Sequence, residues 1–255
     1  MNTQDGGHYD AAVDALAARE YETAGDRYTR GGRRVLADPR PDLDPFEPDE
    51  KGWTGQGLQQ LLMAAVAYRV AGADRRATQR AVEGIAATRD FQRVLDAPGQ
   101  GACLAEFVAD FRVAGELEGP EKAYDDAAER YAVVGDEVDS PQALATTPLF
   151  GAAAATIKQV ARGQANGEIA VTWEDLHGPD PSQAGDFLAH RARYKKQRFA
   201  GLVAGAIADG HLAAPRGTTE YGNETRRCPA CGSNDVNWAG TDVLCMRCST
   251  PTEEV

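Results

Sequence analysis

Two pairs of cysteines near the C-terminus constrain this chain more than any other feature of its sequence. Cys228 and Cys231 are separated by two residues, and so are Cys245 and Cys248. A two-residue spacer closes a tight turn that brings both thiolates to one side of a tetrahedral ion, at about 2.3 Å from a zinc centre. We therefore predict that these four thiolates bind one zinc ion, Zn2+.

The segment between the two pairs predicts a β-hairpin that carries one metal-binding turn at each end. Val236 and Trp238 alternate with a polar residue, residues 240–242 offer a turn, and Val243 and Leu244 begin the returning strand. This arrangement is a zinc ribbon. Because protein ligands fill all four positions, we expect the metal to be structural and not a Lewis acid. A module this small has too little core to fold without its ion.

Three other uses of the cysteines compete with zinc binding. Disulfides need an oxidising compartment, and the first residues have neither the basic region nor the apolar run of a signal peptide, so we expect a cytoplasmic protein. A redox Cys-x-x-Cys motif needs a βαβ setting, which the sequence does not predict. A rubredoxin-like iron site stays open as an alternative to zinc.

The cysteine region resembles a known module. Cys-Pro-x-Cys-Gly followed by Leu-Cys-x-x-Cys is similar to the N-terminal ribbon of the archaeal and eukaryotic transcription factor IIB, over about residues 225 to 250. The resemblance implies a zinc ribbon fold. The cyclin-like repeats of that factor are not recognisable in the preceding residues, so it does not imply recruitment of a polymerase.

The charge of the chain is strongly negative, at −12 for 255 residues, and only five residues are lysines. Dispersed acidic residues with abundant alanine and little lysine resemble the proteins of salt-accumulating (halophilic) archaea. In multimolar salt such charges are screened within about 3 Å, so they bear on solubility more than on partners. An acidic functional face is the alternative. No apolar stretch approaches eighteen residues, so we expect no membrane partner.

Helical periodicity dominates the remaining sequence, and the predicted fold class is all-α. Tyr9, Ala12, Val13 and Leu16 follow the i, i+3, i+4, i+7 pattern of an amphipathic helix. The segment Tyr-Glu-Thr-Ala that follows resembles the second helix of a tetratricopeptide repeat. We therefore predict an antiparallel, tetratricopeptide-like array of helical hairpins over residues 1–180, interrupted by a loop at 38–57 that contains four prolines.

A short internal repeat supports the prediction of stacked hairpins. Tyr-Arg-Val-Ala-Gly at residues 68–72 returns as Phe-Arg-Val-Ala-Gly at residues 111–115. Each copy is expected to end one helix, with its glycine at the C-terminal stop, before a new helix begins. Coincidence within an alanine-rich bundle is the alternative interpretation. Residues 181–210 are predicted to form a long basic helix, residues 211–224 a linker, and residues 225–255 the ribbon.

The long helix reverses the charge balance of the chain. Residues 188–227 carry a net charge of +5, whereas residues 1–187 carry −14. Arg191, Lys195 and Arg198 share one helical face by their i, i+4, i+7 spacing. A candidate binding surface for nucleic acid or another partner therefore comprises Arg191, Lys195, Arg198, Arg226, Arg227 and Trp238. In the alternative interpretation, the basic side chains of the helix pair with acidic residues of the helical array.

The sequence offers no catalytic constellation. The four histidines are scattered, no phosphate-binding loop or nucleophile elbow is recognisable, and Cys103 beside an apolar stripe is expected to be a packed thiol. We therefore predict a non-enzymatic adaptor with no evident small-molecule substrate. It would bind a protein partner through the helical array and a second macromolecule through the ribbon. A nucleic-acid-associated, transcription-related factor is the alternative.

Overall fold

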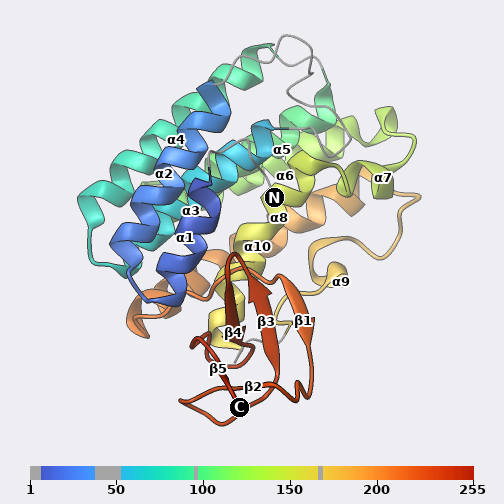
Figure 1. The fold of residues 1–255 in the computed structure, drawn as a ribbon. Coiled ribbons are helices and arrows are strands. Elements are labelled where there is room, and N and C mark those ends of the chain that lie inside the picture. The colour runs from blue at the N-terminus through green and yellow to red at the C-terminus, as the bar shows by residue number, and fades with distance from the viewer. Residues whose placement is uncertain (1–6, 38–52, 95–96, 166–168) are drawn as a thin grey trace.

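A helical body followed by a small region of strands makes up the computed structural model of this protein, which describes residues 7–37, 53–94, 97–165 and 169–255 (Figure 1). The helices are α1 (His8–Ala17), α2 (Tyr21–Ala37), α3 (Thr54–Val70), α4 (Asp74–Val94), α5 (Pro98–Ala114), α6 (Pro120–Val134), the short 3-10 turn η2 (Gly135–Glu137), α7 (Pro141–Ala145), α8 (Pro148–Gln164), α9 (Trp173–Leu176) and α10 (Ala184–Ala208). The strands are β1 (Thr218–Glu220), β2 (Arg226–Arg227), β3 (Val236–Ala239), β4 (Asp242–Cys245) and β5 (Glu253–Glu254).

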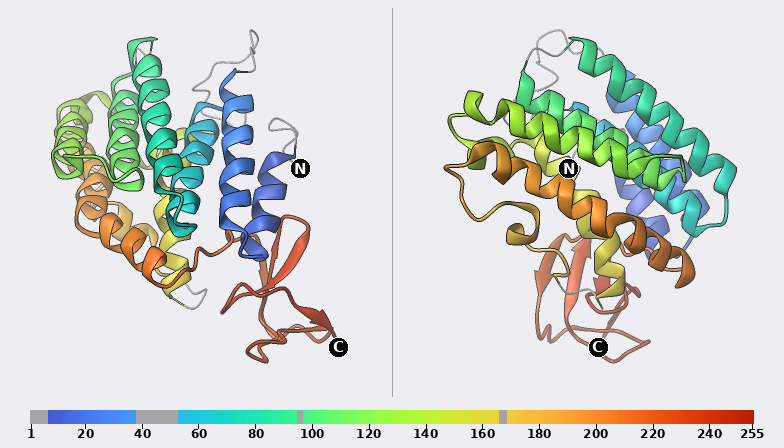
Figure 2. Two further views of the ribbon diagram at one scale, coloured as in Figure 1. Left: turned by 90° about the vertical axis from the view of Figure 1, so that its left-hand side faces the viewer. Right: turned by 180° about the vertical axis from the view of Figure 1, so that it is seen from behind.

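The predicted fold class is confirmed. Helices α1 to α6 pack in sequence order as antiparallel neighbours, so consecutive helices lie side by side (Figure 2). Helix α8 packs on α3, and α10 packs on α6 and α8. These two later helices cover the array, so α3 is enclosed by α2, α4, α5, α8 and α10. The result is a closed helical body with one continuous core. None of the described helices combines the length and the apolar character needed to cross a lipid bilayer.

Helix α3 begins at Thr54, four residues before the start at Leu58 that its apolar pattern predicts. The loop predicted from the four prolines extended to residue 57 and so included Gly55 and Gly57. A Cβ atom at Gly55 would lie 2.8 Å from the Cα of Leu149, and one at Gly57 would lie 2.6 Å from the side chain of Leu36. These glycines therefore let α3 approach its neighbours closely. Residues 38–52 of the predicted loop lie outside the described residues.

Both copies of the short repeat end a helix, as predicted, but the left-handed residue that follows the helix lies one position later in the second copy. In the first copy Gly72 adopts the left-handed conformation, with φ +73°. In the second copy Gly115 stays right-handed, and the left-handed residue is Glu116, with φ 52°. The amide of Ala73 donates to Tyr68, whereas the equivalent amide of Leu117 donates to Arg112. Matching residues of the two copies are therefore 43 positions apart in the sequence motif. Residues with matching hydrogen bonds are 44 positions apart.

The predicted β-hairpin is present. Strands β3 and β4 pair antiparallel around a turn at Gly240, with Val236 opposite Cys245. Strand β1, which lies in the predicted linker, pairs with the other edge of β3, giving the sheet order β1-β3-β4. Strands β2 and β5 form a separate two-stranded sheet.

The strand region is packed on the helical body. Leu212 and Ala214, which precede β1, are each 1% exposed and belong to the same hydrophobic core as the helices. On α8, the side chain of Gln159 donates to the carbonyl of Ala213 at 2.9 Å. The turn after β3 contacts α1, where the Thr241 hydroxyl lies 2.9 Å from a carboxylate oxygen of Asp14. The first part of residues 211–224 therefore fixes the strands to the body.

Candidate metal centre and the predicted basic surface

The four cysteines predicted to bind a metal come together at one point. Cys228 follows β2 and Cys245 ends β4, while Cys231 and Cys248 close the turns that follow. The Sγ atoms of Cys228 and Cys248 are 3.5 Å apart, as are those of Cys231 and Cys245. All four Sγ atoms lie within 4.8 Å of one another.

This geometry fits a single tetrahedral ion. Four sulfur atoms at about 2.3 Å from a common centre are separated by about 3.8 Å along each edge of the tetrahedron. The sulfur distances of 3.5 Å and, for Cys231 and Cys248, 3.8 Å match this edge length. The four cysteines can therefore hold one metal ion, and together they complete a four-coordinate shell.

The two turns have the same local design. The amide of Gly232 donates to the carbonyl of Cys228 at 2.9 Å, and the amide of Ser249 donates to the carbonyl of Cys245 at 3.0 Å. The residue after the second cysteine of each turn is left-handed, namely Gly232 with φ +73° and Ser249 with φ 54°. Glycine adopts this conformation without a steric penalty, whereas serine does not. The second turn is therefore the more strained of the two.

The acidity differs between two of the thiols. Burial raises the pKa of Cys245 to about 12. Burial acts in the same direction on Cys248, but hydrogen bonds with Thr250 outweigh it and bring the pKa of that thiol to about 7. Four adjacent thiolates repel one another, and a divalent ion at their centre removes that repulsion.

The structure corrects the predicted basic face of α10. Arg191 and Lys195 are each only 1% exposed, so they are not part of a surface strip. The alternative interpretation, that they pair with acidic residues of the helical array, is confirmed. The carboxylate of Glu106 lies 2.8 Å from the Nε of Arg191 and 2.7 Å from the Nζ of Lys195. Lys195 also donates to Asp110 at 2.6 Å.

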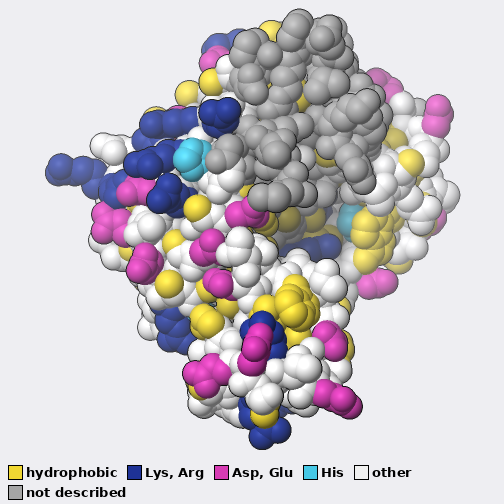
Figure 3. Space-filling model, in the orientation of Figure 1, with side chains coloured by type: hydrophobic (Ala, Val, Ile, Leu, Met, Phe, Trp, Pro, Cys, Tyr) yellow, Lys and Arg dark blue, Asp and Glu magenta, His cyan; other side chains and the backbone are white. Residues whose placement is uncertain are grey.

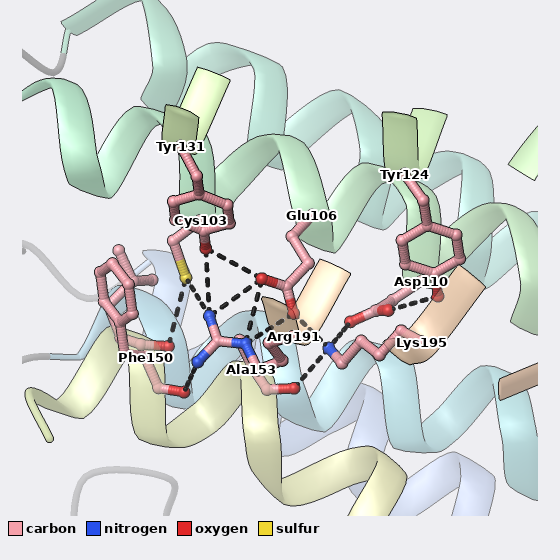
Figure 4. A network of polar contacts seen from close by, with 10 residues as sticks. Cys103, Glu106, Asp110, Tyr124, Tyr131, Phe150, Ala153, Arg191 and Lys195 are labelled. Carbon is pink, nitrogen blue, oxygen red and sulfur yellow. Dashed lines mark hydrogen bonds and ion pairs between the residues drawn. The ribbon is translucent and has the colours of Figure 1, made fainter. Parts of the chain in front are cut away.

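Neighbouring groups complete this buried charge network, which we define as Glu106, Asp110, Arg191 and Lys195 (Figure 4). The hydroxyls of Tyr131 and Tyr124, both on α6, donate to the two carboxylates at 2.9 and 2.7 Å. The carbonyl of Phe150 accepts from Arg191, and that of Ala153 accepts from Lys195. Burial tends to raise the pKa of Glu106, but Arg191 and Lys195 outweigh it and lower that pKa. The network lies between α5 and α10, and its neighbouring groups connect it to α6 and α8.

A sequence signal for this network existed but was missed. Glu106 and Asp110 are spaced i, i+4 on the helix that also carries buried Phe107, and Arg191 and Lys195 have the same spacing. Acidic and basic pairs of equal spacing on two apolar helices can meet face to face. The periodicity of α10 alone could not separate the two interpretations, because its buried and charged positions share one face.

The other predicted binding residues lie on the surface. Arg198 is on the exposed side of α10. On the strand region, Trp238 is 43% exposed, and the guanidinium of Arg226 lies 5.5 Å from the centre of its indole ring. Arg226 also pairs with Glu254 at 3.2 Å, while Arg227 is exposed. Of the predicted binding residues, the structure therefore brings Arg226 and Trp238 together on the surface, whereas Arg191 and Lys195 are buried and cannot belong to a binding surface.

Cys103, the remaining cysteine, is a packed thiol, as predicted. It is fully buried on α5, and burial raises its pKa to about 12. Its sulfur lies 3.5 Å from the Nη2 of Arg191, at the edge of the buried charge network.

The chain matches no protein-family model, and searches of the curated proteins and of the solved structures gave no match. The resemblances to the transcription factor IIB ribbon, to tetratricopeptide repeats and to proteins of salt-accumulating archaea therefore stay predictions from the sequence. What the structure supports by itself is a helical body with a four-cysteine cluster that can hold a metal ion.

Proposed function

We propose that this protein is a cytoplasmic, non-enzymatic adaptor, and that the ion in its four-cysteine cluster is zinc with a structural role. A complete shell of four thiolates is typical of structural zinc sites, because catalytic sites keep one position for water or substrate. The ion would hold the strand region in shape, so that this region can serve as a second binding surface beside the helical body.

The observation that carries the adaptor proposal is the exposure of Trp238 on strands that are fixed to the body. Trp238 leaves 43% of its surface exposed, and tryptophan is among the residue types most enriched at binding hot spots. Docking on the body keeps the indole in a constant position relative to the helices. A macromolecule bound at Trp238 is then held beside whatever the body binds.

For the protein partner of the body, we propose the groove between the C-terminal ends of α5 and α10. This groove has a volume of about 560 Å³, and its apolar wall includes Val113, Leu117, Val203 and Ile207. At the rim of the groove, Arg69 pairs with Glu116 at 2.6 Å. A short apolar protein segment fits a wall of this character better than a charged one.

Metal content tests the first part of the proposal. Elemental analysis of the purified protein should find one zinc per chain, and Cys231→Ser should lose that zinc together with the amide protection of β3 and β4. If the analysis finds iron in place of zinc, the rubredoxin-like alternative is the correct one. Purified protein without bound metal, or strands that stay protected in Cys231→Ser, would remove the structural role.

Partner capture with matched variants tests the second part. A protein that co-purifies with the wild-type chain at equal stoichiometry should be lost with Ile207→Asp and kept with Val133→Asp, which places the same charge on the 77% exposed Val133 of α6. A second macromolecule should be lost with Trp238→Ala alone. Recovery of no stoichiometric partner, or equal retention by Ile207→Asp and the wild type, would contradict the adaptor proposal.

A nucleic-acid-associated, transcription-related role is the second candidate, and the stacking of Arg226 on Trp238 favours it. An arginine beside an exposed aromatic ring is typical of surfaces that bind single strands. Binding to short DNA and RNA should weaken steeply as salt is raised, and replacing Arg226 and Arg227 by Gln should flatten that dependence. Arg191 and Lys195 are unsuitable for this test, because they are buried. An unchanged salt slope would exclude this candidate.

A further inference from the structure

Six arginines from two helices gather on one side of the helical body. Arg76 near the start of α4 contacts Glu22 near the start of α2 at 2.7 Å. Further along both helices, Arg33 contacts Glu83 at 2.7 Å, so α2 and α4 lie side by side and run in the same direction. Figure 3 shows Lys and Arg side chains gathered at the upper left, where α2 and α4 lie in Figure 1. We define the arginine surface as Arg27, Arg30 and Arg33 of α2 with Arg75, Arg76 and Arg80 of α4.

The arginine surface is positive because its bases outnumber the acids that contact them. Within the described part of the chain, the carboxylates in contact with these arginines are those of Glu22, Asp26 and Glu83. Six bases and three acids leave an excess of three positive charges, in a chain whose net charge is −12. All six bases are arginines, whose planar guanidinium can bind phosphate through two parallel hydrogen bonds. The surface therefore favours a partner that carries phosphate groups.

A small pocket lies within the arginine surface, between α2 and α4. Its volume is about 230 Å³. The residues that line it are Asp26, Thr29, Arg30, Arg33, Tyr68, Arg76, Gln79 and Arg80. Sites for whole small molecules have volumes of about 300 to 1,000 Å³. The pocket is therefore too small for a nucleotide, but it can take one phosphate group of a longer ligand.

Tyr68 of α3, which is 1% exposed, forms the base of this pocket. Its hydroxyl donates to Asp26 at 2.6 Å and accepts from Arg76 at 2.9 Å. Gly25 makes room for the ring, because a Cβ atom there would lie 2.6 Å from it. In the second copy of the short repeat, Phe111 takes the place of Tyr68 and has no hydroxyl. The hydroxyl of Tyr68 is thus an addition to the repeat, and it fixes the guanidinium of Arg76 at the pocket.

The arginine surface offers no ring on which a base could stack. Among the described residues, none of the aromatic side chains on α2 and α4 is exposed, and the large apolar side chains exposed there are Val82 and Val94. Proteins that bind single strands stack the bases on aromatic side chains. In a duplex the phosphates of both strands are accessible and can be contacted without reaching a base. Arginines without an aromatic ring therefore favour the backbone of a duplex.

We propose that the arginine surface binds the phosphate backbone of double-stranded nucleic acid, with one phosphate in the pocket between α2 and α4. Arg27 and Arg75 contact neighbouring phosphates. Contacts to phosphates carry no direct information on base sequence, so the affinity should not depend on the sequence of the duplex. This surface is separate from Arg226 and Trp238 of the strand region, and it goes beyond the adaptor role without depending on it.

Fluorescence anisotropy with labelled duplexes of DNA and of RNA, each in two unrelated sequences, tests the proposal. The wild-type chain should bind both sequences equally, and its affinity should fall steeply as salt is raised. Replacing Arg27, Arg30 and Arg75 together by Gln should make the slope of log affinity against log salt less negative by about 3, because each phosphate contact contributes about one unit. The affinity itself should fall by at least about tenfold.

A matched control removes the same charge from exposed positions elsewhere. It replaces Lys122 and Arg130 of α6 and Arg193 of α10 by Gln, and it should leave both the affinity and the salt slope unchanged. Circular dichroism should show that both triple variants keep the helical content of the wild type.

Three outcomes would overturn the proposal. One is the absence of salt-sensitive duplex binding, and another is an equal salt slope for the wild type and the variant of Arg27, Arg30 and Arg75. The third is tighter binding to single strands than to duplexes, which would contradict recognition of a duplex backbone. Binding to polyglutamate where duplexes do not bind would assign the surface to an acidic protein segment instead.

Discussion

Replacing Arg191 by Met gives the most direct test of how this fold is held together. The change keeps an unbranched side chain of similar length but removes the guanidinium, which contacts both carboxylate oxygens of Glu106, the carbonyl of Phe150 and the hydroxyl of Tyr131. The buried charge network of the wild type is neutral, with two acids and two bases. After the change, Lys195 alone faces two buried carboxylates, so the network has a net charge of −1.

The expected cost follows from this imbalance. Removing one partner of a buried ion pair destabilises a protein by about 3 to 5 kcal/mol, because the remaining charge stays desolvated. Lys196→Gln is the control on the same helix. It breaks the pair between Lys196 and Asp125, whose side chains are 35% and 51% exposed, and a surface pair contributes about 1 kcal/mol at most. Urea unfolding followed by helical circular dichroism measures both variants.

A double variant separates the loss of the charge pair from the loss of packing. Glu106→Gln combined with Arg191→Met leaves Lys195 and Asp110 as a balanced pair, so the second change should cost less than it does alone. We expect a coupling energy of at least about 1 kcal/mol. Additive effects of the two changes, or a loss below about 1.5 kcal/mol for Arg191→Met, would refute the view that the network is a strongly coupled part of the core.

Three further predictions concern pH, backbone strain and metal removal. His177 has its pKa lowered to about 4 by burial, so the folded state resists a proton that the unfolded chain binds below about 6.5. The contribution of His177 to stability is therefore complete above pH 6.5 and is lost as the pH falls. Urea titration should show that the wild type loses roughly 1 to 3 kcal/mol of unfolding free energy between pH 6.5 and pH 4, and that His177→Phe loses less. A parallel pH profile in both would contradict this. Ser249→Gly should raise the unfolding free energy of the metal-bound strand region by about 0.5 to 1 kcal/mol in thermal unfolding. Gly232→Ala should lower it by about 1 to 2 kcal/mol. Effects of equal sign would argue against backbone strain at Ser249. A chelator should remove hydrogen-exchange protection from β3 and β4 but not from α5 and α10, so simultaneous loss in all four would show that the ion supports the whole body.

Local patterns in the sequence were sufficient for the parts of this fold that depend on neighbouring residues. The spacing of Cys228 and Cys231 determines a metal-binding turn by itself, and the alternation around Trp238 determines a strand. Helix periods likewise located α1 and α10. Each of these signals lies within a few residues, so no knowledge of the tertiary structure was needed.

Features that depend on distant segments could not be predicted in the same way. Arg191 meets Glu106 across 85 residues of chain, and nothing in the pattern of α10 states which of its charged residues has a buried partner. The start of α3 was misplaced because the loop predicted from the prolines was extended to residue 57, and the close approach of α8 at Gly55 is a contact between distant segments.

The order in which the residues of the network occur along the chain has a consequence for synthesis of the protein. A nascent polypeptide that has left the ribosome as far as residue 180 contains Glu106 and Asp110 but neither of the bases that neutralise them. Water must continue to solvate these two acids until α10 emerges. Final compaction of the helical body is therefore delayed until most of the chain has been translated, and an expression fragment that stops at residue 180 should remain loosely packed.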